Sequence, residues 1–146
     1  MVAERARALS AAATGIEAVM PAAWVHDIGY AEPLATTGCH HLDGAAYLHA
    51  IGEEALACLV AHHSSGPWEA ELRGLGSALA RYPAPPVRLL AALSWVDLTT
   101  GSGGQRVSIP ARVNEVRERY GADDVVARGL AAALPTLLEV TSEFED

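Results

Sequence analysis

Apolar residues along this chain recur every three to four positions, which is the spacing of one buried face of an α-helix. No stretch of strand length shows the two-residue alternation of a β-strand. Prolines and glycines mark where one helical pattern stops and the next begins. The pattern predicts helices over residues 2–14, 18–28, 41–51, 53–63, 67–75, 87–100, 109–120 and 123–143, the last capped by Asp123. We therefore expect an all-α fold, a compact bundle of about six to eight helices with no sheet.

The composition agrees with this fold class. Of the 146 residues, 51% are hydrophobic but only 5% are aromatic, and the bulk is Ala, Leu and Val. These residues favour closely packed helices over a β-sandwich. A chain of this length buries one good core, and we see no internal repeat and no linker. Residues 1–146 are therefore expected to form a single domain.

The net charge limits the partners. Ten basic residues, all of them arginine, stand against eighteen acidic residues, which gives a formal charge of −8. The electric field of this negative charge repels phosphate backbones and anionic surfaces, so we expect neither nucleic acid nor a membrane as a partner. A small phosphorylated molecule is compatible with the charge if something local and positive, such as a bound metal, overcomes the field.

The expected compartment is the cytoplasm. The chain begins with charged residues, among them Glu4 and Arg5, and lacks the apolar core of a signal peptide. Its longest apolar runs, such as residues 18–25, are far shorter than the ~18 residues of a membrane span. The cysteines Cys39 and Cys58 form no CxxC motif and suggest no disulfide framework.

Histidines are concentrated in one part of the chain. All six lie between residues 26 and 63, namely His26, His40, His41, His49, His62 and His63. Imidazole combined with carboxylate, without a cluster of thiolates, is the ligand set of Mn, Fe, Co, Ni, Zn or Mg. One or two such divalent ions are therefore expected as cofactors. The alternative interpretation is a scatter of unrelated surface histidines.

Helical phase favours the metal site. His63 follows the apolar residues Leu56, Leu59 and Val60 by seven, four and three positions. This spacing places His63 on the apolar face of its helix. Asp97 follows Leu90, Leu93 and Ser94 of its own helix at the same spacing. A buried carboxylate costs several kcal/mol unless it has a partner, and a metal shared with the histidines would supply one. The alternative is an Asp97 that is exposed or bonded to a backbone N–H.

Four segments carry these residues in a distinctive order: AAWVHDIGY (22–30), TGCHHLDG (37–44), VAHHS (60–64) and WVDLTT (95–100). A His-Asp doublet followed by His, by His-His and by a helical Asp resembles the HD superfamily of metal-dependent phosphohydrolases. The resemblance runs from the first helix to about residue 120, and the tail from Asp123 onward carries no family signal. It implies a compact HD-type domain that hydrolyses a phosphate ester of a nucleotide or another small metabolite.

The resemblance also implies roles for single residues. His26 and Asp27 would be the central metal ligands, with Asp27 able to bridge two ions, and Asp97 would be the distal ligand. His40 and one histidine of the doublet 62–63 would complete a second metal site. Asp27 and Asp97 are also the expected catalytic groups.

The chain departs from the family pattern at one point. That pattern begins with another histidine on the first helix, and this chain has none before His26. We expect either a true start upstream of Met1 or a site with one ligand fewer and a weaker hold on its metal. Two alternatives therefore stay open. One is a di-iron oxygenase with an HD-type site, and the other is a degenerate HD domain that only binds a ligand or partner.

Other residues carry weaker signals. Thr99 and Thr100 could donate to a substrate phosphate, or they could simply end their helix. Arg73 could reach a substrate anion, or it could pair with Glu69 at the surface.

The remaining histidines and the cysteines have no strong claim to the site. His41 is given no role, and His49 is expected at the surface or half-buried. A closed zinc site could be drawn from Cys39, His40, Cys58 and His62. Such a site would leave the two aspartates unexplained.

Overall fold

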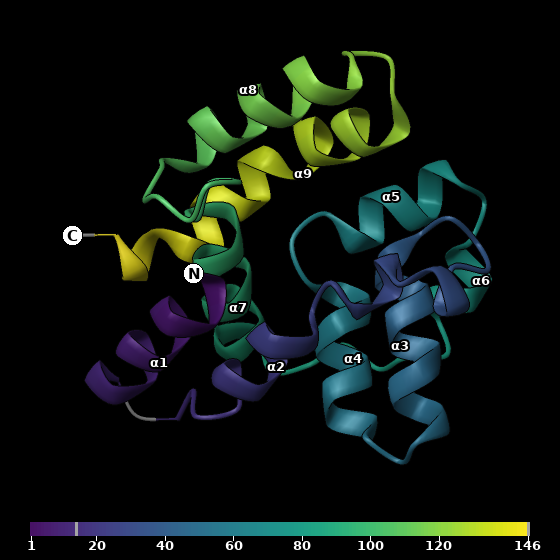
Figure 1. The fold of residues 1–146 in the computed structure, drawn as a ribbon, viewed down its shortest axis with the longest axis horizontal. Coiled ribbons are helices and arrows are strands. Elements are labelled where there is room, and N and C mark those ends of the chain that lie inside the picture. Colours follow the sequence, from purple (N-terminus) through teal and green to yellow (C-terminus); the bar gives the residue numbers. More distant parts are fainter. Residues whose placement is uncertain (14, 146) are drawn as a thin grey trace.

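The computed structural model describes residues 1–13 and 15–145, and this part of the chain is all-α, as predicted (Figure 1). The α-helices in it are α1 (Val2–Ala12), α2 (Val19–Val25), α3 (His40–Ala50), α4 (Glu54–His62), α5 (Gly66–Leu72), α6 (Gly76–Leu79), α7 (Val87–Leu98), α8 (Ile109–Tyr120) and α9 (Val125–Thr141). Short 3-10 helices are η1 (Ile28–Tyr30), η2 (Glu32–Leu34) and η3 (Ser142–Phe144). The described residues form no strand, and their β-pairing is an isolated bridge between Thr100 and Arg106.

The described α-helices outnumber the predicted about six to eight because the helix predicted over 67–75 ends at Leu72 and α6 forms beyond it, at Gly76–Leu79. Gly74 adopts a left-handed φ of +71°, a conformation that favours glycine, directly after α5. The N–H of Leu75 then donates to the carbonyl of Ala70 at 2.7 Å, which is the closing bond of a Schellman motif. The chain leaves the helical path there and begins α6 as a separate element.

Most helix ends differ from the predicted ones by one to three residues, and the first and last helices are examples. The first helix ends at Ala12, and the last residue predicted for it, Thr14, lies outside the described residues. The cap of the last helix is Asp124 and not Asp123, because the Asp124 side chain accepts a hydrogen bond from the N–H of Val126 at 2.9 Å.

Buried apolar side chains form two clusters, and each cluster groups a different set of helices. The first is built mainly by α1, α2, α7, α8 and α9 and includes Leu93 and Ile109. The second is built mainly by α3 and α4 and includes Leu42 and Val60. In Figure 1, α3 and α4 form one antiparallel pair and α8 and α9 form another. Leu56 of α4 packs against both clusters and joins them. The expectation of a single domain stays a prediction.

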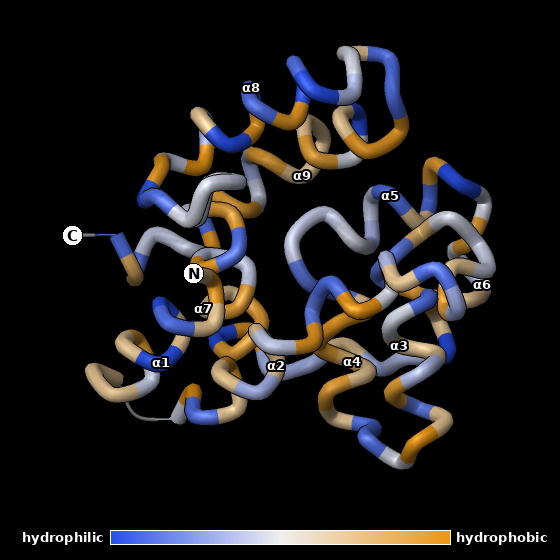
Figure 2. The backbone as a smooth tube through the Cα atoms, viewed as in Figure 1, coloured by the Kyte–Doolittle hydropathy of each residue, from blue (hydrophilic) through white to orange (hydrophobic). Residues whose placement is uncertain are grey.

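Helix α9 belongs to a segment, Val125–Phe144, that is long and apolar enough by length and composition to cross a membrane, with a mean hydropathy of 1.3. A search for uninterrupted apolar runs misses this segment because Arg128 and Glu139 interrupt it. In the structure α9 packs against α5, α7 and α8, and it buries Leu130 and Leu137. Figure 2 shows this mostly hydrophobic helix beside the mostly hydrophilic α8. The placement is compatible with a soluble protein.

Candidate metal centre

His26 and Asp27 lie in the turn between α2 and η1. The helix predicted over 18–28 ends just before His26, and Asp27 has a non-helical backbone with φ −101° and ψ 9°. Gly29 lets η1 lie directly on α3, because a Cβ built on it would come within 2.0 Å of the carbonyl oxygen of His40. Glycine is therefore required at this contact, which holds the His-Asp turn against the first turn of α3.

Two buried histidines are oriented in the same way. His26 Nδ1 lies 2.8 Å from the carbonyl of Ala23, and His63 Nδ1 lies 2.7 Å from the carbonyl of Val60. A carbonyl only accepts hydrogen bonds, so Nδ1 carries the proton and Nε2 holds the lone pair of each neutral ring. Proteins commonly fix the imidazole ligands of a metal by such a bond. The two rings meet edge to face, with their centroids 5.3 Å apart.

His26 Nε2 faces two carboxylates. It lies 3.3 Å from Asp27 Oδ2 and 3.3 Å from Asp97 Oδ1, and it is buried without a well-aligned hydrogen bond to any described residue. Asp97 is held from its other side by Ser64, whose hydroxyl donates to Oδ2 at 2.6 Å. The candidate ligand atoms of His26, His63 and Asp97 all lie within 4.8 Å of one another. A single cation can therefore contact all three.

The chain turns sharply after α4 to bring His63 to Asp97. His63 leaves the helix with a ψ of 149°, and Ser64 has a φ of +51°, which is left-handed for a residue other than glycine. This conformation costs roughly 1–2 kcal/mol for an L-residue. The Ser64 N–H donates to Ser94 Oγ at 2.8 Å, and its hydroxyl binds Asp97. The strained residue thus links the end of α4 to α7, as strained residues at functional sites often do.

A second group of imidazoles lies beside the first. The candidate ligand atoms of His40, His41 and His63 lie within 4.8 Å of one another. His40 Nε2 is 3.4 Å from Asp27 Oδ1, while the other oxygen of Asp27 faces His26. Asp27 therefore lies between two imidazoles, and its role as a bridge between two ions stays a prediction.

His41 is a buried member of the cluster that sequence reasoning left without a role. Its Nδ1 lies 3.6 Å from Glu69 Oε2 and 3.9 Å from Cys39 Sγ, and all three residues are buried. Arg73, predicted to reach a substrate or to pair with Glu69, donates from Nε to Glu69 Oε1 at 3.0 Å. This pair is largely buried and not at the surface. Cys58 belongs to no candidate ligand group in the described part of the chain, so the closed zinc site does not assemble.

The structure places three predicted site residues away from this cluster. The His62 side chain does not join the cluster, because its Nε2 is hydrogen-bonded to the carbonyl oxygen of Tyr82 at 2.9 Å. Thr99 and Thr100 each donate their hydroxyl to the carbonyl four residues earlier at 2.6 Å, so both hydroxyls are engaged at the end of α7. His49 is exposed, as predicted.

The electrostatics of the cluster place a positive charge between the two aspartates. Burial lowers the pKa of His26, but the charges of Asp97 and Asp27 raise it more, to about 11. Burial raises the pKa of both aspartates, yet His26 brings each below its ordinary value. Burial lowers the pKa of His63 to about 4. At neutral pH a proton on His26 therefore occupies the position where a cation fits.

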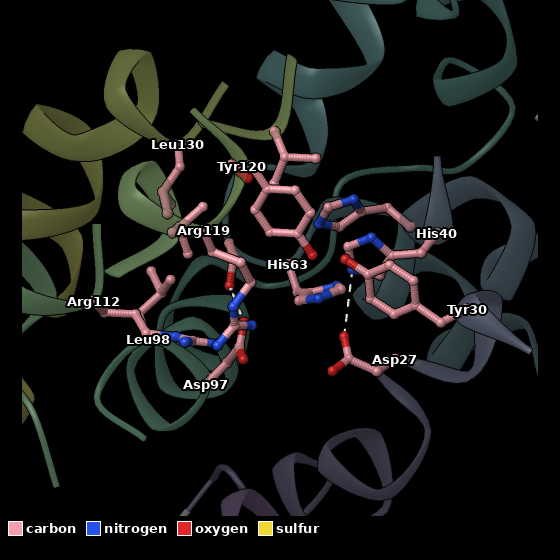
Figure 3. A pocket seen from close by; sticks show the side chains of 15 residues that line it. Asp27, Tyr30, His40, His63, Asp97, Leu98, Arg112, Arg119, Tyr120 and Leu130 are labelled. Carbon is pink, nitrogen blue, oxygen red and sulfur yellow. Dashed lines mark hydrogen bonds and ion pairs between the residues drawn. The ribbon is translucent and has the colours of Figure 1, made fainter. Parts of the chain in front are cut away.

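The cluster opens into a cavity of about 180 Å³. Asp27, His40 and Tyr30 line one side, where the Tyr30 ring stacks on His40 with centroids 4.0 Å apart. Helices α8 and α9 form the facing side (Figure 3). The residues that line that side are Arg112, Val116, Arg119, Tyr120, Val126 and Leu130. The candidate ligands thus border a space that a small molecule can enter.

Comparison with known proteins gives this chain no assignment. No known protein family, no curated protein and no solved structure matches it. The resemblance to the HD superfamily therefore rests on the four sequence segments, and the function has to be argued from the geometry of the site.

Proposed function

We propose that this protein is a cytoplasmic, metal-dependent phosphohydrolase of the HD type that acts on a phosphate ester of a small metabolite. The observation that carries the proposal is the shared orientation of His26 and His63. In each ring Nδ1 is held by a backbone carbonyl, which leaves Nε2 for the cluster that Asp97 completes. Histidines that only fill a core do not need this arrangement beside the largely buried carboxylate of Asp97 and the more exposed carboxylate of Asp27.

The donor set fits one or two divalent ions. His26, Asp27 and Asp97 would hold one ion, and Asp27, His40 and His63 would hold a second. Nitrogen and oxygen donors without thiolates suit Mn, Fe, Co, Ni, Zn or Mg. His26 Nε2 also supports a bound cation, because it is buried 3.3 Å from the carboxylates of Asp27 and Asp97, which favour a positive charge between them.

A bound divalent ion would polarise a phosphoryl oxygen and lower the pKa of a water molecule. Asp27 and Asp97 would accept hydrogen bonds from that water and hold its proton, while Ser64 keeps Asp97 in place. The water oxygen would then bond to phosphorus as the P–O bond to the alcohol breaks. The proton held by the aspartates would pass to the departing alcohol oxygen, which gives the alcohol and inorganic phosphate as products. Tyr30 and Tyr120, which line the cavity, would limit the access of bulk water.

A di-iron oxygenase is the second candidate, because the nitrogen-rich group of His40, His41 and His63 suits iron. Iron content with a mixed-valence EPR signal would select the oxygenase. Turnover of p-nitrophenyl phosphate with Mn or Ni, but not with Fe, would select the hydrolase. A degenerate domain would bind metal or ligand and carry out neither reaction.

The test is the metal content and the turnover of protein purified without chelator. We expect at least about half an equivalent of a transition metal and hydrolysis of p-nitrophenyl phosphate. Asp27→Ala should abolish both. His49→Ala is the matched control, because His49 is exposed and outside the cluster. A folded protein that gains no stability from Mn, Fe, Co, Ni or Zn would contradict the proposal, and so would equal metal loss in the two variants.

A further inference from the structure

Helix α8 presents two arginines to the cavity, across from the histidines. Arg112 and Arg119 both line the cavity, and Figure 3 shows them on the side of Asp97. Residues seven positions apart lie on one face of a helix, and Val116 lies between them on the same face. Arg117 of the same helix is exposed and does not line the cavity. Whether an arginine of α8 reaches the cavity therefore depends on which face of the helix it occupies.

Glu115 holds both arginines in place. Its Oε2 lies 2.9 Å from Arg112 Nη1, and its Oε1 lies 2.9 Å from Arg119 Nη2. The three side chains together keep one net positive charge. Each guanidinium has several N–H donors and gives one of these contacts to Glu115, so donors remain for a second anion. The Arg112 side chain is only 19% exposed, so its charge is less screened by water than that of a surface arginine.

We propose that Arg112 and Arg119 form an anion subsite that binds the phosphate group of a small phosphomonoester. This inference rests on the proposed function, since it supplies the phosphate with a second contact beside the metal centre. The chain carries a net charge of −8, and Asp27 and Asp97 on the cavity wall repel an anion further. Guanidinium groups pair with phosphate oxygens through two parallel hydrogen bonds. The chain has no lysine that could take their place.

The cavity restricts the organic part of the ester. Its volume of about 180 Å³ is below the roughly 300 Å³ at which pockets for drug-sized ligands begin. Apolar side chains of Leu98, Val116 and Leu130 line it together with the arginines. A phosphate on a short carbon skeleton fits this space, whereas the base of a nucleotide would have to remain in solvent. The subsite therefore favours a small phosphomonoester over a nucleotide.

Inorganic phosphate is the probe for the subsite. We expect Arg112→Gln and Arg119→Gln each to weaken phosphate binding to the Mn²⁺-loaded protein by about tenfold or more, because a charge-assisted contact is lost. Arg117→Gln is the matched control from the same helix and should bind phosphate like the wild type. Arg112→Lys serves if the glutamine variant does not fold. The lysine variant keeps the positive charge but loses the planar guanidinium with its paired N–H donors, so it should also weaken phosphate binding.

Glu115→Gln separates binding from a purely structural role. Removal of the competing carboxylate should tighten phosphate binding, the opposite of the effect of the arginine variants. The arginines could instead serve only to pair with Glu115. In that case Arg112→Gln, Arg119→Gln and Glu115→Gln would all lose thermal stability and keep the phosphate affinity of the wild type. Unchanged phosphate affinity in arginine variants that still hold metal would overturn the subsite.

Metal content distinguishes failure of the subsite from failure of the proposed function. A wild-type protein that binds no metal contradicts the function, whereas metal-loaded variants with normal phosphate affinity contradict only the subsite. The size argument is tested separately with glycerol phosphate and adenosine monophosphate. We expect kcat/KM to be at least about tenfold higher for glycerol phosphate. Equal or higher kcat/KM for the nucleotide would overturn the preference for a small ester.

Discussion

The imidazole of His26 is buried between two carboxylates, so its charge state decides what the cluster can bind. With a pKa of about 11 it is protonated at neutral pH, whereas His63, with a pKa of about 4, is neutral. A metal ion needs the lone pair on Nε2, and the proton and the metal therefore compete for the same nitrogen. The competition makes metal binding depend on pH.

Binding of one divalent ion near pH 7 should release about one proton, and His26 is its source. Asp27 and Asp97 add none, because their lowered pKa values keep them ionised at this pH. The affinity for the ion should consequently fall as the pH falls, by about tenfold per pH unit. Calorimetric titration in two buffers of different ionisation enthalpy measures the number of protons. Metal binding without proton release would remove His26 from the ligand set.

Single residues were predictable where their burial follows from helical phase. Asp97 is still within α7, which ends at Leu98, so its position relative to the leucines of that helix indicates correctly that it is largely buried, and it lines the cavity. Helical phase also points to His63, which is buried, although α4 already ends at His62. The left-handed Ser64 then turns the chain so that His63, and not His62, enters the site. Helical phase gives no reason for His41 to be buried, since the burial of His41 depends on its contact with Glu69 from a different helix.

At the scale of elements, the site depends on how closely η1 approaches α3. A Cβ on Gly29 would meet the carbonyl oxygen of His40 at 2.0 Å and the backbone N of Gly44 at 2.6 Å. Both neighbours are backbone atoms of α3, so they cannot move aside as a flexible side chain would. The turn that carries His26 and Asp27 is continuous with η1 and shares this constraint.

Gly29→Ala should therefore separate η1 from α3. We expect a loss of about 1–3 kcal/mol in the free energy of unfolding, the usual cost of overpacking, together with weaker metal binding. Gly76→Ala is the matched control, because a Cβ on Gly76 meets nothing within 4 Å. Chemical denaturation and metal titration of both variants measure the effects. Wild-type stability and metal affinity in Gly29→Ala would show that the η1–α3 contact does not support the site.

The elements themselves were more predictable than their contacts. The helix expected over 109–120 forms at those residues, with Ser108 as its cap. Its arginines nevertheless carried no signal, because α8 reaches the cavity only by packing on α9 and the end of α7. A helical pattern shows which face of a helix is apolar, but it does not show which distant segment that face will meet.

Across the whole molecule, the candidate ligands lie on or beside helices that build both apolar clusters. His26 and Asp27 follow α2, and Asp97 lies on α7, and both helices contribute to the first cluster. His40 begins α3 and His63 follows α4, which belong to the second. An ion held by ligands from both groups would connect the two halves of the core. Metal binding should therefore stabilise the whole fold and not only a loop.

We expect a saturating divalent ion to raise the thermal midpoint of the protein and a chelator to lower it. An ion at 100 times its Kd contributes about 2.7 kcal/mol to stability, which for a chain of this size corresponds to a shift of roughly 5–10 °C. Asp27→Ala should lose the shift, since its carboxylate lies between His26 and His40, whereas His49→Ala should keep it. Scanning calorimetry with and without metal makes the measurement. An ion that binds the folded state alone must stabilise it, so an unchanged midpoint in the presence of bound metal would mean that the unfolded chain binds the ion as well, and would contradict a site that forms only on folding.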